Sequence, residues 1–248
     1  MKQKLYQWLI RIDKKENLRR LLDGTISFSI PQYWRKIGDG INDISEGVLA
    51  IELKDNHISY IPGDSRKIKN ILKFSYDNKN YILDSRIDYV PTLCFYSFEY
   101  NTKYHELPKK YFDDFIVNKE DYGFIVIEAK KFNERLKEAL SKFGFKSDDL
   151  FFHSIKYIKK DDSFSTLDKF PYELLYKDKH YEYQNEVRFF ITSTDNLALE
   201  KLKSNAYYVD VNLSDLISGL HTIPGDNEYA SFTRENDSYI LAIKERSS

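Results

Sequence analysis

The chain has 248 residues, of which 42% are hydrophobic and 31% are charged, a composition typical of a globular protein that buries a sizeable core. Its 38 basic and 39 acidic side chains give a formal net charge of -1. This balance excludes a general attraction to nucleic acids or membranes, so a polyanion would have to bind a local patch.

The predicted elements begin with a strand over residues 4–12 and a short helix over residues 13–24. The apolar run of the strand is too short, and too soon followed by charges, for a signal peptide or a membrane span. In the helix, Asp13 is the predicted N-cap, Leu18, Leu21 and Leu22 make the apolar stripe, and Gly24 stands where a helix is expected to end. The next predicted elements are a strand over 25–30, a polar loop over 31–47, a hairpin over 73–87, a strand over 92–100 and a helix over 107–116.

The second half of the chain is richer in strands. The nearly all-apolar segment at 122–129 is typical of a central strand, and the helical spacing of Phe132 and Leu136 predicts a helix over 130–145. Further strands are predicted over 149–158, 181–190, 206–211 and 238–243. Because no repeat or compositional break divides the chain, the sequence predicts one α+β domain over residues 1–248, with strand-rich mixed sheets and a few short helices.

The single cysteine bears on the compartment. Cys94 has no second cysteine with which to form an intramolecular disulfide or a cysteine-based zinc site. This usage fits a reducing environment. We therefore expect a cytoplasmic protein with no membrane partner.

Every second residue of the strand predicted over 181–190 is polar. The residues that would share one face are Glu182, Gln184, Glu186 and Arg188. Hydrogen-bonding side chains in such a row need either solvent or a ligand. We therefore expect this face to line a cleft, with the loop at 31–47 beside it.

Several short motifs resemble, in the same order, those of a widespread uncharacterised bacterial domain family. That family's pattern reads Phe-Ser-x-Pro, Asn-Asp-Pro-Phe-Glu, Cys-Phe-Ser and Glu-x-Glu-x-Arg. The matching residues of this chain are Phe28, Ser29, Pro31, Asn42, Asp43, Glu46, Cys94, Phe95, Ser97, Gln184, Glu186 and Arg188. Among these residues, Gln184 stands where the pattern has its first Glu; in addition, Ile44 and Ser45 replace Pro-Phe, and Tyr96 is inserted.

A more distant resemblance suggests a reaction. ADP-ribosyltransferases of the Arg-Ser-Glu class carry an Arg on the first strand, a Ser on a middle strand, and a Glu-x-Glu or Gln-x-Glu pair on a late strand. The matching residues here are Arg11, Ser97, Gln184 and Glu186, although the middle segment lacks a Ser-Thr-Ser run. The resemblance implies an ADP-ribosyltransferase-like fold and NAD as the substrate. Gln184 in place of Glu implies an acceptor other than arginine, such as asparagine or a nucleobase.

The residue types fit the chemistry of that transfer. Cleavage of nicotinamide from ribose builds positive charge on the sugar, which a fixed carboxylate such as Glu186 would stabilise. Arg11 would bind the pyrophosphate, since a guanidinium holds phosphate through two hydrogen bonds, and Arg188 would pair with Glu186 or with the phosphates. Ser97 would orient Glu186, and Gln184 would meet the acceptor. We expect such an enzyme to be a toxin or a phage-defence effector that acts on nucleic acid or protein, with a neutralising antitoxin as a further partner.

Other interpretations stay open. Glu186 and Arg188 are also typical of a solvated ion pair on an edge strand, and Arg11 of an exposed residue in an apolar strand. A metal-dependent nuclease would hold Mg²⁺ with Asp43, Glu46 and Glu186, whereas the five histidines show no spacing that suggests zinc. A non-catalytic nucleic-acid or protein binder would use tyrosines and phenylalanines for stacking and the lysine pairs that begin at positions 109, 130 and 159 for phosphate contacts.

Overall fold

Strands dominate the described part of the chain, which confirms the predicted α+β class. The computed structural model describes residues 6–36, 47–53, 71–76, 78–99, 102–113, 119–160, 170–235 and 238–246. The helices are α1 (Lys15–Leu22), α2 (Pro31–Lys36), α3 (Lys109–Asp113), α4 (Ala129–Ser141) and α5 (Asn196–Ser204), with short 3-10 helices η2 (Ser85–Tyr89), η3 (Lys119–Asp121), η4 (Ser147–Asp149), η5 (Tyr172–Leu175) and η6 (Lys179–Gln184). The strands are β1 (Tyr6–Lys14), β2 (Thr25–Ser27), β3 (Val48–Leu53), β4 (Ile71–Tyr76), β5 (Lys79–Asp84), β6 (Thr92–Glu99), β7 (Tyr104–Glu106), β8 (Tyr122–Glu128), β9 (Leu150–Ser154), β10 (Lys156–Ile158), β11 (Tyr176–Asp178), β12 (Glu186–Ile191), β13 (Tyr208–Asp210), β14 (His221–Thr222), β15 (Glu228–Glu235) and β16 (Ser238–Glu245).

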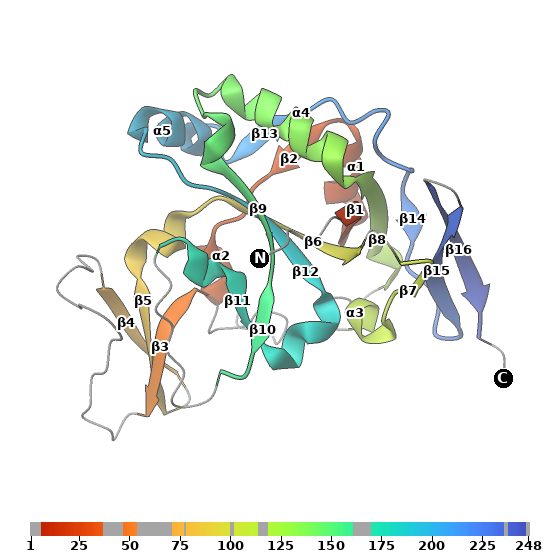
Figure 1. Cartoon of the computed structure of the whole chain (residues 1–248), viewed down its shortest axis with the longest axis horizontal. Coiled ribbons are helices and arrows are strands. Elements are labelled where there is room, and N and C mark those ends of the chain that lie inside the picture. The colour runs from red at the N-terminus through yellow and green to blue at the C-terminus, as the bar shows by residue number, and fades with distance from the viewer. Residues whose placement is uncertain are drawn as a thin grey trace.

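A six-stranded sheet forms the centre of the structure (Figure 1). Its strand order is β14-β8-β1-β6-β12-β9, and each neighbouring pair is antiparallel. The apolar segment predicted as a central strand is β8, whose five inner residues are all buried because both faces of the sheet are covered. The strands that carry the predicted Arg, Ser and Glu, namely β1, β6 and β12, lie side by side.

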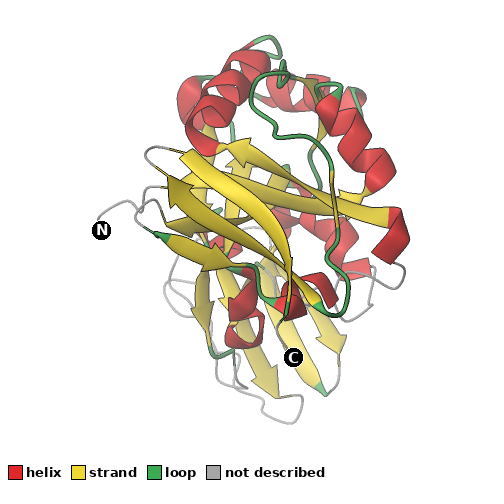
Figure 2. Ribbon diagram, turned by 90° about the vertical axis from the view of Figure 1, so that its right-hand side faces the viewer, coloured by secondary structure: helices red, strands yellow, loops and turns green. Residues whose placement is uncertain are grey.

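The two faces of this sheet are covered differently. On one side, which we call the helical face, Leu9, Phe95 and Val187 belong to the same core cluster as the buried side chains of α1, α4 and α5. Figures 1 and 2 show these helices gathered on that side. On the other side, which we call the opposite face, Ile10 and Tyr96 pack with β15.

Register decides which residues share a face. Ile10 is the partner of Tyr96, and Tyr96 is the partner of Glu186, so these three side chains lie on the opposite face. Ser97 is the partner of Leu9 and lies on the helical face. Arg11, two residues after Leu9 on the same strand, is on the helical face as well.

Smaller sheets surround the central one. The order β16-β15-β7 makes a three-stranded sheet, β3-β5-β4 makes another, and β13-β2 and β10-β11 form pairs, of which β10-β11 is parallel. In Figure 1, β3, β10, β11 and α3 lie on the side away from α4 and α5. The described helices include none with the length and apolar composition that crossing a bilayer requires.

The prediction of a strand over residues 181–190 is wrong for the first half of that segment. Residues 179–184 form η6, and Asp178 caps this 3-10 helix by accepting a hydrogen bond from the backbone N–H of His180. Asn185 then takes the left-handed conformation with φ of 36°, and the strand begins only at Glu186. The predicted row of polar side chains is therefore reduced to Glu186 and Arg188 on one strand.

Other boundaries also differ. Of the helix predicted over residues 107–116, the structure describes residues 109–113 as helical, and these form α3. Residues 31–36 of the predicted loop form the helix α2. Residues 37–46 of that loop lie outside the described ranges. Strand β1 continues to Lys14, so Asp13 is a strand residue whose carboxylate accepts from Asn17 instead of capping α1.

The turn at Gly24, after α1, allows a test of its close packing against Val211, the residue after β13. Gly24 has φ of +90°, and a Cβ atom there would lie 2.5 Å from the carbonyl oxygen of Val211. Gly219 has φ of +102° with nothing within 4 Å of such an atom. We expect Gly219→Ala to lower the free energy of unfolding by about 1–2 kcal/mol through backbone strain alone. Gly24→Ala should cost about 1–3 kcal/mol more because it also forces the two backbones apart.

Urea unfolding of both variants measures the difference. The Gly219 variant is the matched control because it changes the same residue type in a similar conformation. Equal losses in the two variants would contradict the close approach of Gly24 to Val211.

Candidate functional site

Glu186 is the centre of a buried ionic network on the opposite face. Its Oε2 lies 3.0 Å from Nζ of Lys177, and its Oε1 accepts from Nε of Arg188. The backbone N–H of Glu186 donates to the hydroxyl of Tyr157 at 2.7 Å. Nη1 of Arg188 donates to the carbonyl oxygen of Leu174 at 2.8 Å. The network therefore ties β12 to β10, β11 and η5.

The charges of this network are removed from water. The side chains of Lys177, Glu186 and Arg188 are 6%, 7% and 1% exposed. Burial alone raises the pKa of Glu186, but the positive charges of Arg188 and Lys177 outweigh that effect and hold the pKa well below its ordinary value of 4.5. Glu186 is therefore a carboxylate at neutral pH. The interpretation of Glu186 and Arg188 as a solvated surface pair is wrong, because both side chains are buried.

Gln184 does not lie on the strand that carries Glu186 and Arg188. It is the last residue of η6, is 3% exposed, and has an Nε2 without a hydrogen-bond partner among the described residues. The left-handed Asn185 separates it from β12, so Gln184 and Glu186 are not neighbours on one strand face. Arg188 binds Glu186 and Leu174 through its guanidinium, which makes it a support for the carboxylate.

Arg11 and Ser97 lie on the helical face, so the sheet separates them from Glu186. Ser97 is fully buried and its Oγ donates to the carbonyl oxygen of Trp8 at 2.8 Å, a contact between β6 and β1. Arg11 donates through Nη1 to the carbonyl oxygen of Cys94 at 2.8 Å and through Nη2 to Asp13 at 3.0 Å. The predicted constellation of Arg11, Ser97 and Glu186 is therefore not assembled at one place.

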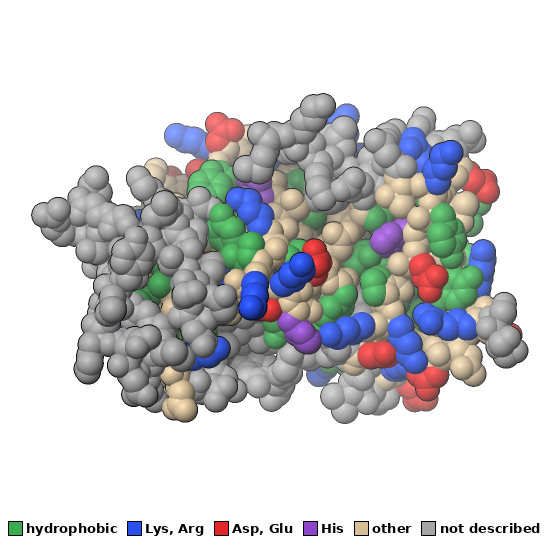
Figure 3. Space-filling model, turned by 60° about the horizontal axis from the view of Figure 1, so that its bottom comes forward, with side chains coloured by type: hydrophobic (Ala, Val, Ile, Leu, Met, Phe, Trp, Pro, Cys, Tyr) green, Lys and Arg blue, Asp and Glu red, His purple; other side chains and the backbone are tan. Residues whose placement is uncertain are grey.

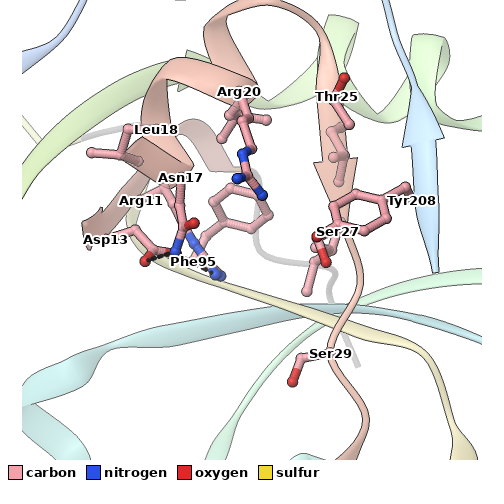
Figure 4. Close-up of a pocket in the computed structure, with 13 residues that line it drawn as sticks. Arg11, Asp13, Asn17, Leu18, Arg20, Thr25, Ser27, Ser29, Phe95 and Tyr208 are labelled. Atoms are coloured by element: carbon pink, nitrogen blue, oxygen red, sulfur yellow. Dashed lines mark hydrogen bonds and ion pairs between the residues drawn. The ribbon is translucent and has the colours of Figure 1, made fainter. Parts of the chain in front are cut away.

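A pocket opens around Arg11 instead, with a volume of about 270 Å³ (Figure 4). It lies between β1, α1, β2 and β6 on the helical face, and we call it the Arg11 pocket. Its lining residues are Arg11, Asp13, Asn17, Leu18, Arg20, Leu21, Thr25, Ile26, Ser27, Ser29, Leu93, Phe95 and Tyr208. Figure 4 shows Arg11, Asp13 and Asn17 on one side of the hollow and Ser27 and Tyr208 on the other.

Local sequence explains how these polar groups meet. In α1, Asn17 and Arg20 are one turn apart at the edge of the apolar stripe that buries Leu18 and Leu21. After the turn at Gly24, hydroxyl residues alternate with buried Ile26 and Phe28. The hydroxyl residues in this segment are Thr25, Ser27 and Ser29. Both patterns are visible in the sequence, and they indicate the polar side of each element.

The charges of the Arg11 pocket are partly compensated. Burial raises the pKa of Asp13, but Arg11 and hydrogen bonds from Asn17 and Lys14 lower it more, so the pKa lies below its ordinary value. Arg20 pairs with Glu16 at 2.6 Å, and both side chains are more than half exposed. An exposed pair one helical turn apart is worth only about 0.3–0.5 kcal/mol. An anionic ligand can therefore replace Glu16 as the partner of Arg20 with only a small loss of free energy.

The metal site expected for a nuclease has no described counterpart. Asp43 and Glu46 lie outside the described ranges, and within those ranges no three His, Cys, Asp or Glu side chains are grouped so that they could hold a metal ion.

Comparison of the chain with protein-family models, with curated protein sequences and with solved structures found no match. The resemblance to ADP-ribosyltransferases therefore stays a prediction, and function has to be argued from the residues themselves.

The ionic network predicts a stability that depends on Glu186. Glu186→Gln should lower the free energy of unfolding by about 3–5 kcal/mol at neutral pH, because it leaves Arg188 and Lys177 buried without a counter-charge. Since the pKa of Glu186 is lower in the folded than in the unfolded chain, its contribution is complete above 4.5 and is lost as the pH falls below that value. The gap between wild type and variant should narrow accordingly in urea unfolding at acidic pH.

Glu106→Gln is the matched control. Glu106 pairs with Arg246 at 3.3 Å, but both side chains are more than 40% exposed, so its loss should cost at most about 1 kcal/mol. A Glu186→Gln variant as stable as the Glu106→Gln variant would show that the network does not support the fold.

Proposed function

We propose that this protein binds a small phosphorylated molecule of the mononucleotide or sugar-phosphate type in the Arg11 pocket. The observation that carries the proposal is that the guanidinium of Arg20 lines the same hollow as Arg11, Asp13 and several hydroxyl and amide side chains. Guanidinium groups recognise phosphate oxygens through paired, charge-assisted hydrogen bonds. The hydroxyl and amide groups are suited to a sugar.

The volume of the pocket limits the size of the ligands that can bind in it. Pockets for drug-sized ligands have volumes of about 300–1,000 Å³, and the Arg11 pocket, at about 270 Å³, is just below that range. It can enclose a mononucleotide or part of one. NAD, a dinucleotide, would place one half in the pocket and leave the other half outside.

The two ends of the pocket have different charge. Asp13 remains ionised beside Arg11 and Asn17, so this end accepts hydrogen bonds from sugar hydroxyls and repels a phosphate. Figure 4 shows Arg20 apart from Asp13, and the ion-pair partner of Arg20 is the exposed Glu16. The phosphate therefore belongs at Arg20, and Arg11, held in place by Cys94 and Asp13, orients the sugar end.

A second candidate is ADP-ribosyl transfer from NAD at Glu186. It is supported by the adjacency of β1, β6 and β12, which follows the layout of the resembled enzymes, and by the carboxylate that Lys177 and Arg188 keep ionised. A fixed negative charge is what the developing oxocarbenium ion requires. Reaction at this place would involve Glu186 and Gln184 and would need Lys177 to release one carboxylate oxygen. Arg11 and Ser97 would have no part in it.

The pocket proposal predicts a specific loss of affinity. Arg20→Gln should weaken binding of adenosine monophosphate by about tenfold, or 1.4 kcal/mol, the size expected for one partly exposed charge-assisted contact. Arg19→Gln, one residue away on the same helix, removes the same charge outside the pocket lining and should change affinity less than about twofold. Isothermal titration calorimetry measures both. Equal binding of adenosine and of its monophosphate would contradict the role of phosphate.

The transfer proposal predicts release of nicotinamide from NAD. Glu186→Gln should slow that release by on the order of 10²- to 10³-fold, whereas Glu182→Gln, an exposed carboxylate of η6, should leave it unchanged. Nicotinamide is measured with and without cell extract, and circular dichroism shows that the variants are folded at the assay temperature. A wild-type protein that releases no nicotinamide under either condition would remove this candidate.

A further inference from the structure

We infer that the surface around η6 binds single-stranded nucleic acid. Three lysine ammonium groups lie over tyrosine rings there: Lys110 over Tyr183 at 4.4 Å, Lys156 over Tyr176 at 4.9 Å and Lys177 over Tyr181 at 5.1 Å. We use the name Lys–Tyr surface for Lys110, Lys156, Tyr176, Tyr181 and Tyr183, which are exposed or partly exposed, whereas Lys177 is buried. They come from α3, β10, β11 and η6, and η6 contacts each of the other three elements.

The charge of this surface is locally positive although the chain as a whole is not. Lys109, Lys110, Lys156 and Lys179 are exposed on these elements. The same elements carry two exposed carboxylates, Asp113 of α3, which lies 3.5 Å from Lys119, and Glu182 of η6, so the exposed lysines outnumber them. The carboxylate of Asp178 accepts from the backbone N–H groups of Lys160 and His180. Figure 3 views the molecule from this side and shows Lys and Arg side chains among hydrophobic and a few acidic ones across the middle of the face.

The combination of groups indicates the partner. Lysines spaced along a surface contact successive phosphates, and tyrosine rings stack on bases, which are accessible only where the strand is unpaired. An acidic peptide would use the lysines but has no bases to place on the rings. A membrane would require exposed aliphatic side chains, and the exposed ones in the described ranges are Leu197, Ile240 and Ile243, on α5 and β16.

The ionic network holds the surface in shape. Lys177 is shared between the carboxylate of Glu186 and the ring of Tyr181, so the tyrosine is packed on a buried, fixed cation. Lys156 also donates through Nζ to the hydroxyl of Tyr176 at 3.2 Å. The rings are therefore positioned before any ligand arrives, which lowers the entropic cost of binding.

Fluorescence anisotropy with a labelled single strand of about 20 nucleotides tests the inference. The double variant Lys110→Gln with Lys156→Gln should weaken binding on the order of tenfold at about 0.1 M salt. It should also reduce the slope of log affinity against log salt by about 1.4, the value for two phosphate contacts with a single strand. Tyr183→Leu should weaken binding while leaving the salt slope unchanged, because it removes a ring and no charge.

The control double variant is Lys201→Gln with Lys203→Gln. These lysines are exposed on α5, which covers the helical face, and their substitution changes the net charge by the same amount. Binding of this variant should stay within about twofold of the wild type. Affinity for adenosine monophosphate is measured in parallel on the same proteins, so failure here is distinguishable from failure of the Arg11 pocket.

Three results would overturn the inference. One is the absence of binding to single-stranded DNA and RNA by the wild type at low salt. Another is an equal loss of affinity in the two double lysine variants, which would mean that only net charge matters. The third is equal affinity for a duplex of the same length, which would exclude stacking of the tyrosine rings on bases.

Discussion

The alternation of side chains along neighbouring strands decides which groups of this protein can act together. Strands β1, β6 and β12 lie side by side, and each sends consecutive residues to opposite faces of the sheet. Arg11 and Ser97 therefore belong to the helical face, and Glu186 and Arg188 to the opposite face. The pocket on one side and the ionic network on the other both follow from this division. No movement of a single side chain can join them, because the backbone of the sheet stands between.

The ionic network also affects the free energy of folding. Removing three charged groups from water is costly, and their attraction offsets the cost only when geometry and hydrogen bonds are good. Here the carboxylate of Glu186 has a cation at each oxygen, and Arg188 also donates to a backbone carbonyl. A hydrophobic replacement of similar volume could be as stable. What the charges add is specificity: they fix where β11 and η5 meet β12, and through Lys177 they position a tyrosine ring at the surface.

Local pattern predicted much of the fold and less of the site. The α+β class, the central strand β8 and the helix α4 follow from apolar spacing, because burial at these residues repeats along the chain. The faces could not be predicted in the same way, since they depend on register between distant strands, such as Leu9 with Ser97, and a shift of one residue would exchange the faces. The 3-10 helix before Glu186 was missed because its cap, Asp178, and the left-handed Asn185 are local features that interrupt an otherwise alternating sequence. The side chain of Lys177 reaches Glu186 only through tertiary packing of β11, and no spacing in the sequence indicates it.

The separation of the two proposed binding regions constrains how they would work together. The Arg11 pocket is on the helical face, and the Lys–Tyr surface is on the side of η6 and α3, so a phosphorylated ligand and a nucleic acid strand would not compete for the same groups (Figure 1). Any coupling between them would have to pass through β1, β6 and β12, where Phe95 and Phe189 pack in edge-to-face contact on the helical face and Glu186 is held on the other. Close packing of this kind resists small shifts. Independent binding is therefore the expectation from the structure. Occupancy of the pocket would influence the nucleic acid surface only if a ligand could select a different arrangement of these strands.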